Sequence, residues 1–384
     1  MNPEMPVSYR CWAEVDLNAL RENLAWLRDR VGPQTKIMTV VKADAYGHGL
    51  KQIAALLMQS GTDIFGVANL AEAQSIRSIG RGWPILMLGA CLPHEVDTLV
   101  RDNVMPTLSS LDEAKLLSAA AEKWRRTVDV HIKIDTGMGR LGVQPDQSLS
   151  LIEQVQQLPH LRLQGLYTHF CVVEDDASFS QHQSDLFCGV VREVRKRNLP
   201  IPWIHACNSG ALLHESSSLF NVVRPGLLVY GIVPSGKRIS TSTLRKSVHP
   251  ALSWKCRISL VKNIAPGTSI SYGRIFVADR PLKVATLTAG YGDGYLRAAS
   301  QKAEVLIRGR RCRILGRITM DQMIADITRV PEAQPGDEVI LIGHQGKAQI
   351  TASELAEWMG TIPWEVFTCI TARVPRIYHG SHAA

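Results

Sequence analysis

The sequence contains no run of about 20 apolar residues, the length that a helix needs to cross a lipid bilayer. Its first ten residues, Met1 to Arg10, lack the basic and then apolar layout of a secretory signal peptide. Neither an internal repeat nor a low-complexity tract is present. These absences exclude a membrane protein built on helices and a repeat protein. They predict a cytoplasmic protein that does not work at a membrane.

Cysteine occurs at eight positions but never as a C-x-x-C pair. This spacing excludes the common zinc and thioredoxin-like motifs, and we expect no metal site. In a reducing compartment the cysteines are expected to be small buried hydrophobic residues. Cys171 lies two residues after His169, which admits a Cys/His nucleophile. We favour the alternative that Cys171 is a wall residue of a barrel.

Aromatic residues make up only 6% of the chain, although its formal net charge is +8. Basic residues gather at 192–197 and 308–313. A protein that binds single-stranded nucleic acid interleaves such charges with aromatic residues, and neither segment does so. The first segment is typical of the last turn of a helix and the second of one edge of a strand. We therefore expect no nucleic-acid partner.

With 384 residues, the chain exceeds what one hydrophobic core usually serves, so we expect two domains. Between about 37 and 230, short apolar runs alternate with longer segments of helical pattern. This alternation predicts an α/β fold, a (β/α)8 barrel. The eight expected strands are 37–41, 64–67, 85–88, 104–108, 128–134, 163–168, 203–206 and 221–223.

The helical pattern is clear at 109–123. Ser109 and Asp112 have the spacing of a capping box, with Asp in place of Glu or Gln. Leu116 and Leu117 are expected on one apolar face. This segment therefore predicts one of the helices that cover the barrel.

The alternation stops near Pro234, and the polar residues 235–250 are expected to link two domains. Beyond them, β-rich runs separated by turn signals predict a mostly β domain with one helix at 351–359. An alternating strand at 12–17 is expected to join that second domain. The expected domains are residues 1–17 for the N-terminal strand, 18–240 for the barrel and 241–384 for the C-terminal domain.

Polar side chains follow several of the expected barrel strands. In such barrels, functional groups collect at the carboxyl ends of the strands. Lys42 ends the first apolar strand, where burial would lower the pKa of its amine and favour the neutral form that a Schiff base requires. A lysine that reaches solvent is the alternative for this residue taken alone. The other residues at strand ends or in the following loops are Arg140, His169, Asn208, Ser209 and Arg224.

The run around Lys42, VVKADAYGHG at 40–49, resembles the cofactor-lysine motif of the alanine racemase family. Further segments resemble the family's motifs in order along nearly the whole chain. These segments are 131–142 (HIKIDTGMGRLG), 167–170 (YTHF), 208–209 (NS), 223–226 (VRPG), 271–273 (SYG), 290–295 (GYGDGY) and 320–322 (MDQ).

The resemblance implies an isomerase that interconverts L- and D-alanine with pyridoxal 5′-phosphate. Lys42 would hold the cofactor as an internal aldimine and exchange the proton on the D face. Tyr272 of a partner subunit would serve the L face, because racemisation needs a base on each side of one carbon. His169 and Arg224 would neighbour Tyr272, and Arg224 would contact the pyridine nitrogen. Active sites shared in this way imply a homodimer.

The resemblance also implies the binding residues. Arg140 and the backbone N–H of Met320 from the other subunit would meet the substrate carboxylate. Lys133 matches a family lysine that can be carbamylated and then pair with Arg140. Tyr46, Asn208, Ser209, Gly226 and Leu227 would bind the cofactor, chiefly its phosphate. The residues that match the entrance of the active site are Glu174, Tyr291, Arg297, Arg317 and Trp364.

Trp364 departs from the family pattern, because most members have tyrosine there. Indole is larger than phenol and only donates hydrogen bonds. A racemase of another small amino acid such as serine is therefore an alternative. A fold-related decarboxylase and a non-catalytic carrier of the cofactor are two further alternatives. A decarboxylase would lack the motif at 44–49 and Tyr272, and a carrier is usually a single barrel.

Overall fold

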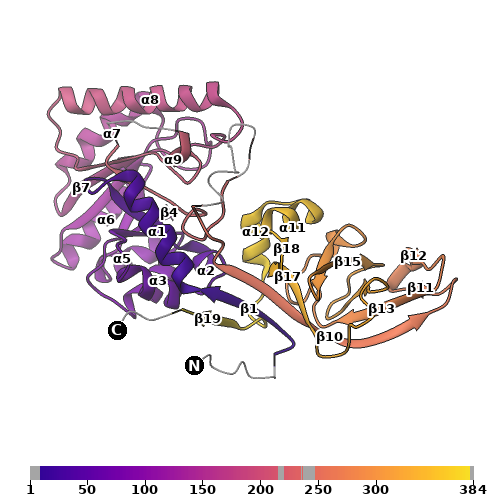
Figure 1. Cartoon of the computed structure of the whole chain (residues 1–384). Helices are drawn as coiled ribbons and strands as arrows, with labels where there is room; N and C mark the ends of the chain where they lie inside the picture. The colour runs from indigo at the N-terminus through magenta and orange to yellow at the C-terminus, as the bar shows by residue number, and fades with distance from the viewer. Residues whose placement is uncertain (1–8, 215–219, 235, 237–246, 381–384) are drawn as a thin grey trace. The chain divides into compact units, whose positions relative to one another are not determined.

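The computed structural model of the chain describes residues 9–214, 220–234, 236 and 247–380 (Figure 1). They form two compact units, which divide between His249 and Pro250. The expected boundary between residues 240 and 241 lies outside the described residues. The barrel unit takes its described residues from 19–45 and 49–249, and the β unit from 9–18, 46–48 and 250–380.

The barrel unit contains eight parallel strands in the order β8-β7-β6-β5-β4-β3-β2-β9. Between β8 and β9, Asn221 N donates to Ile204 O (3.0 Å) and Arg224 N to Cys207 O (2.8 Å), so the barrel is nearly closed. The strands are β2 (Lys36–Val40), β3 (Ile64–Val67), β4 (Ile85–Ala90), β5 (Met105–Leu108), β6 (Val128–Lys133), β7 (Leu161–Tyr167), β8 (Trp203–His205) and β9 (Val222–Val223).

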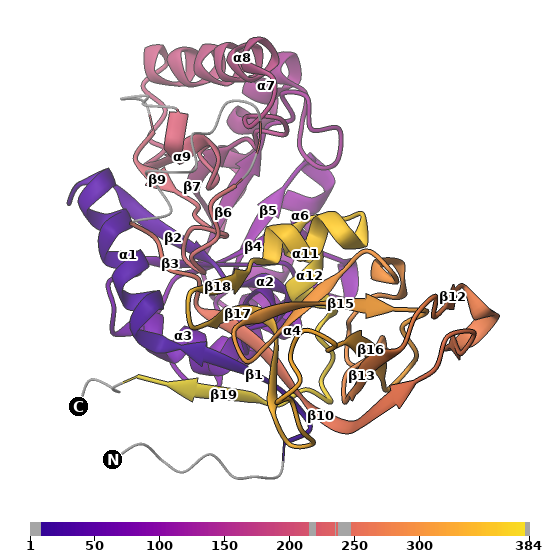
Figure 2. The same ribbon diagram turned by 45° about the vertical axis from the view of Figure 1, so that its right-hand side comes forward.

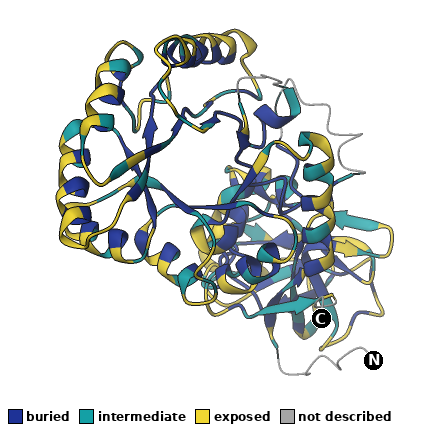
Figure 3. Ribbon diagram, turned by 90° about the vertical axis from the view of Figure 1, so that its left-hand side faces the viewer, coloured by how far each residue is buried: buried dark blue, intermediate teal, exposed yellow. Residues whose placement is uncertain are grey.

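Helices surround these strands, with their buried faces turned inward and their exposed faces outward (Figure 3). Inside, one residue from each of five strands forms a buried cluster, which consists of Met38, Ile64, Leu86, Met105 and Val222. The helices are α1 (Leu17–Val31), α3 (Leu50–Met58), α4 (Leu70–Arg77), α5 (Val96–Arg101), α6 (Leu111–Lys123), α7 (Pro145–Gln157), α8 (Ala177–Lys196) and α9 (Ala211–His214).

The start of α6 corrects the capping box predicted at Ser109 and Asp112. Ser110 is the N-cap: its hydroxyl accepts the amide of Glu113 (3.3 Å), and the Glu113 carboxylate accepts the amide of Ser110 (3.2 Å). Glu113 has the longer side chain that this reciprocal arrangement needs. Leu116 is also not on the buried face; it is 49% exposed, whereas Leu117 is buried.

The β unit contains a nine-stranded sheet in the order β18-β17-β14-β15-β16-β13-β10-β1-β19, and β17 also pairs with β10. Along β10, Trp254, Cys256 and Ile258 are buried while the residues between them are partly exposed, as expected for a strand with one face in a core. The strands are β1 (Cys11–Asp16), β10 (Leu252–Ile264), β13 (Leu282–Leu287), β14 (Glu304–Ile307), β15 (Arg310–Leu315), β16 (Met323–Asp326), β17 (Glu338–Gln345), β18 (Ala348–Ile350) and β19 (Arg376–His379).

The N-terminal strand β1 lies in this sheet, antiparallel to β10 and parallel to β19 (Figure 2). A short hairpin, β11 (Ser269–Ile270) with β12 (Phe276–Val277), carries Tyr272 in its turn. The β unit also contains two helices, α11 (Ala352–Met359) and α12 (Pro363–Cys369). The sequence analysis found only the first of them, although Pro363 at the first helical position is a recognised start signal.

In the parts of the chain that the structure describes, no helix has both the length and the apolar character that a membrane span requires.

Candidate active site

Lys42 lies two residues after the end of β2, at the start of a turn with unusual backbone geometry. The turn, α2 (Lys42–Tyr46), has φ between +52° and +55° at residues 43–46, which is left-handed helix. For residues other than glycine this conformation costs about 1–2 kcal/mol each. Ala45 N donates to Val41 O (2.9 Å) within the turn. Such strain persists only where surrounding contacts hold the backbone, which is common at functional sites.

Arg224 follows β9, and its guanidinium is fully buried in the barrel unit. Nη1 donates to His205 Nδ1 (2.8 Å). Nη2 donates to the carbonyls of Thr168 (2.7 Å) and Ala206 (3.0 Å) and lies 3.3 Å from His169 Nδ1. Burial lowers the pKa of Arg224 to about 10, so the side chain remains a cation at neutral pH.

The arginine determines which ring nitrogen of a neighbouring histidine carries hydrogen. A guanidinium only donates, so His205 Nδ1 must accept from Nη1, and the His205 ring then carries its hydrogen on Nε2. His205 Nε2 in turn lies 3.0 Å from His131 Nδ1. Burial lowers the pKa of His131 to about 3 and holds that of His169 and His205 well below the ordinary range. The three rings are therefore neutral beside one cation.

Two lysines near Arg224 have depressed pKa values. Burial lowers the pKa of the Lys42 amine, and the charges of Arg140 and Arg224 lower it further. Burial and the same two arginines lower the pKa of Lys133 to about 8. Lys133 Nζ lies 5.8 Å from the centre of the Tyr167 ring. This concentration of positive charge favours an anionic ligand.

Arg140 lies in the loop after β6 and is exposed. Asp135 Oδ1 organises this loop by accepting the amides of Gly137 and Gly139, both at 3.0 Å. Gly142 has a φ of +120°, and a Cβ there would lie 2.8 Å from Asp135 N. The DTGMGRLG segment therefore needs its aspartate and glycines to fold back on the strand. The sequence analysis assigned Asp135 no role.

The loops after β8 and β9 meet at Ser209. Its Oγ accepts the amides of Gly226 (2.9 Å) and Leu228 (3.4 Å), whereas the Leu227 amide finds no acceptor among the described residues. Asn208 holds its own loop, because Oδ1 accepts the Ala211 amide (2.9 Å) and Nδ2 donates to Phe170 O (3.2 Å).

Glu174, expected at the entrance, lies against the same loops. A Cβ added to Gly210 would lie 2.2 Å from Glu174 Oε1, and one on Gly236 would lie 2.5 Å from Glu174 Cβ. The approach at position 236 requires glycine, because the Glu174 backbone oxygen also lies 2.5 Å from that Cβ.

The other predicted residues belong to the β unit. Tyr272 begins a short helical turn, η2 (Tyr272–Arg274), and is 71% exposed. Ser271 Oγ donates to Arg317 O (2.6 Å), which attaches this turn to the Arg317 loop. Tyr46 is buried, Arg297 is exposed, and Trp364 is partly buried in α12.

Two β-unit loops that carry predicted residues are bonded to each other. Tyr291 N donates to Thr319 O (3.0 Å), and Gly292 N donates to Met320 O (2.8 Å). A Cβ on Gly290 would lie 2.2 Å from Thr319 O, so the contact requires glycine. The loops position Tyr291 and Met320 together.

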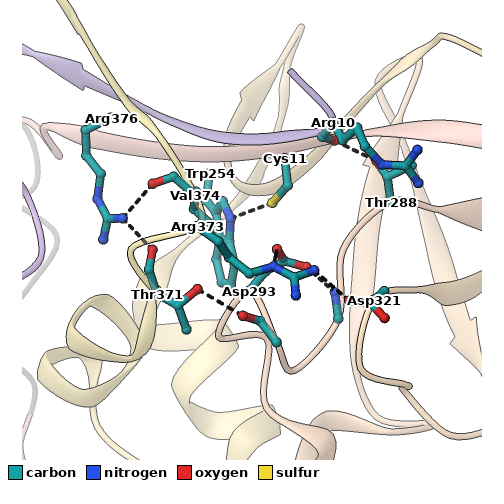
Figure 4. A network of polar contacts seen from close by, with 12 residues as sticks. Arg10, Cys11, Trp254, Thr288, Asp293, Asp321, Thr371, Arg373, Val374 and Arg376 are labelled. Atoms are coloured by element: carbon teal, nitrogen blue, oxygen red, sulfur yellow. Dashed lines mark hydrogen bonds and ion pairs between the residues drawn. The ribbon is translucent and has the colours of Figure 1, made fainter. Parts of the chain in front are cut away.

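Arg373 bridges the same two loops (Figure 4). Its Nε donates to Asp293 Oδ1 (2.8 Å) and its Nη2 to Asp321 Oδ1 (2.7 Å). Sequence reasoning missed this role because the arginine is 80 and 52 residues from its partners. No local motif marks such a contact.

Gly290→Ala tests the close contact between these loops. The methyl group would force the loops apart, and we expect the free energy of unfolding to fall by about 1–3 kcal/mol. Denaturant unfolding measures this change. Gly82→Ala is the control, because nothing lies within 4 Å of a Cβ there. Equal stability of the two variants would contradict the contact.

The structure offers no support for the Cys/His nucleophile. The Cys171 thiol lies 3.3 Å from Gln183 Oε1, and burial raises its pKa. The second basic segment is partly neutralised, because Arg308 pairs with Asp337, and Arg311 with Glu304 and Glu354.

A barrel with a lysine turn at its strand ends, joined to a β unit, is the architecture of the enzyme class that the sequence motifs indicated. Residues 15–234 match the family description "Alanine racemase, N-terminal domain", and residues 251–378 match "Alanine racemase, C-terminal domain". The chain therefore belongs to the alanine racemase family. The predicted family, its isomerase class and the (β/α)8 barrel with a mostly β C-terminal domain are confirmed.

Individual relatives match along nearly the whole chain. It is 43% identical to alanine racemase of Methylacidiphilum infernorum, over 97% of this chain and 94% of the relative. Identity to the Halothermothrix orenii enzyme is 40%, over 96% of each. The solved structure of alanine racemase from D-cycloserine producing Streptomyces lavendulae superimposes with a TM-score of 0.92 at 32% identity, covering 99% of both chains.

Proposed function

We propose that this chain interconverts L- and D-alanine with pyridoxal 5′-phosphate bound at the strand ends of the barrel. The observation that carries the proposal is Lys42, an amine of lowered pKa on a strained turn, in a chain of the alanine racemase family. Its neutral form is the one that can attack the cofactor's aldehyde. Bound there, the cofactor withdraws electrons from the α-carbon of the amino acid and acidifies its hydrogen.

The donors in the barrel unit fit the other parts of this cofactor. Arg224 is a buried cation whose hydrogen-bond partners in the described residues are histidines and carbonyls, and it keeps N–H groups that can donate toward the pyridine nitrogen. The Ser209 hydroxyl and the Leu227 amide can donate hydrogen bonds to the phosphate, because peptide amides at the start of a helical turn bind anions. We assign Tyr46, Asn208 and Gly226 to the same group, with Asn208 acting through the loop that it holds.

Two bases on opposite sides of the α-carbon would carry out the proton transfers. We assign the D face to Lys42 and the L face to Tyr272 of a second copy of this chain, with His169 and Arg224 next to that phenol. The proposal of a homodimer is supported by the surface around Tyr272, where Ile275 and Val277 are 40% and 45% exposed.

Arg140 and the Met320 amide of the second copy would bind the substrate carboxylate, with Glu174, Tyr291, Arg297 and Arg317 at the entrance. The exposed guanidinium of Arg140 offers a two-pronged contact to a carboxylate. Carbamylation of Lys133 is supported by its pKa of about 8, which leaves a fraction of neutral amine at neutral pH. The eight free cysteines fit the reducing cytoplasm, where we place the protein.

Proton NMR of the purified protein with L-alanine in deuterium oxide tests the activity. We expect loss of the α-hydrogen signal, and chiral chromatography of the same sample should show D-alanine. Release of carbon dioxide would instead establish the decarboxylase. Cofactor binding without exchange would establish the carrier.

Substitution of Trp364 tests the substrate preference. If the indole narrows the substrate pocket, Trp364→Ala admits larger amino acids, and Trp364→Tyr restores the ordinary family preference. One misfitting methylene is worth roughly 10- to 200-fold in kcat/KM. The measurement is kcat/KM for alanine, serine and larger amino acids. Trp358→Phe in α11 is the control, because Trp358 packs on a buried cluster of the β unit. If both Trp364 variants keep the parent's order of substrate preference, Trp364 is a packing residue and does not set the specificity.

A further inference from the structure

Glu72, in the first turn of α4, makes contacts that differ from those of its counterpart in α6. Asn69 caps α4 by accepting the Glu72 amide (3.0 Å). A glutamate at this third helical position ordinarily reaches back to the amide of its own N-cap residue, as Glu113 does in α6. Glu72 Oε2 accepts the amide of Ala68 (2.7 Å), as Glu113 accepts that of Ser109 (2.6 Å). The difference is at Oε1, which accepts the amide of Ala43 (2.7 Å) in the turn after β2.

The Glu72 carboxylate therefore connects the end of β3 to the turn after β2. Ala43 is the residue next to Lys42 and the first with left-handed backbone geometry. An ionised carboxylate forms stronger hydrogen bonds to backbone amides than a neutral acceptor does. One such bond at Ala43 helps to hold the strained conformation that presents Lys42.

The Glu72 charge also opposes the cations around Lys42. Burial, Arg140 and Arg224 lower the pKa of the lysine, whereas Glu72 raises it. Among the described residues, no other carboxylate acts on Lys42 in this way. The titratable and charged groups that face Lys42 are Glu72, Arg140, Arg224, Lys133 and His169.

We propose that Glu72 is a positioning residue for Lys42: its carboxylate clamps the left-handed turn at Ala43 and offsets the positive charge around the amine. The proposal rests on the function assigned to Lys42. It adds a residue that holds the backbone of the turn and sets the charge near the amine.

Competitive acetylation of the full-length protein measures the pKa of Lys42 directly. The cofactor is first removed with hydroxylamine, and Lys42 acetylation is then followed by mass spectrometry across a pH series. We expect Glu72→Gln to lower the pKa of Lys42, because the charge is lost. Glu113→Gln is the matched control, since that carboxylate also accepts two amides at the start of its helix but does not contact the Lys42 turn. An identical Lys42 titration in both variants would overturn the charge role.

Cofactor retention measures the clamp. Glu72→Asp keeps the charge but is too short to reach both amides, so we expect pyridoxal phosphate to dissociate roughly tenfold faster with little change in the Lys42 titration. Ala43→Gly removes the steric cost of the left-handed turn. In that background Glu72→Asp should accelerate release much less. Equal acceleration in both backgrounds contradicts the clamp.

The two measurements distinguish a failure of the Glu72 role from a failure of the proposed function. A parent protein that does not racemise alanine would refute the function, while the Lys42 titration and the Ala43→Gly comparison would still decide the role of Glu72. Thermal unfolding shows whether each variant folds. If Glu72→Gln does not fold, Glu72→Asp with and without Ala43→Gly tests the clamp.

Discussion

Replacing Lys42 by alanine is expected to abolish covalent attachment of the cofactor and racemisation together. The substitution removes both the amine that attacks the aldehyde and the base assigned to the D face. Loss of a general base alone costs roughly 10²- to 10⁴-fold in rate, and loss of the covalent attachment adds to this. Visible absorbance and borohydride reduction followed by mass spectrometry measure the covalent attachment, and the racemisation rate measures the activity.

The fold should survive this substitution. Lys42 is partly exposed, and burial together with the charges of Arg140 and Arg224 disfavours its charged form more than Glu72 favours it, so removing the amine should not destabilise the fold. Lys36 at the opposite end of β2 provides the control, because Lys36→Ala changes a lysine of the same strand far from the turn. A Lys42→Ala protein that still becomes covalently labelled by reduction with borohydride would refute the assignment.

The barrel was predictable because its strands are short apolar runs separated by helical segments. All eight expected runs overlap the observed strands, since strands buried on both faces need continuous apolar residues. The start of α6 was misplaced by one residue because Ser109 and Ser110 are both plausible caps. The helix α12 was missed because it is short and carries little periodicity.

The candidate site was only partly predictable. The positions of Lys42 and Arg224 at strand ends could be predicted, because functional groups of such barrels collect there. The left-handed turn was not predictable, because residues 43–45 are alanine and aspartate, whereas positive φ is usually marked by glycine. Glu72 and Arg373 act through contacts distant in sequence, which no local pattern reveals.

Residues of the β unit show a second limit of sequence reasoning. The motif around Tyr272 indicates a catalytic residue only through the family resemblance, since an exposed tyrosine in a hairpin turn has no local feature of a base. Its 71% exposure makes it available to a second copy, and it also makes the substitution of its hydroxyl structurally mild. Tyr272 is therefore well suited to test the two-base proposal.

Tyr272→Phe is expected to remove the L-face base while leaving the cofactor bound, because only the phenolic hydroxyl is lost. In deuterium oxide, exchange of the α-hydrogen should persist from D-alanine through Lys42 and fall roughly 10²- to 10⁴-fold from L-alanine. Proton NMR of each enantiomer measures the two rates separately. Tyr291→Phe is the matched control, since Tyr291 is a 39% exposed tyrosine of the same unit with no assigned proton transfer. Equal losses from both enantiomers in the Tyr272 variant would mean that this tyrosine does not serve one face, and the two-base assignment would then be wrong.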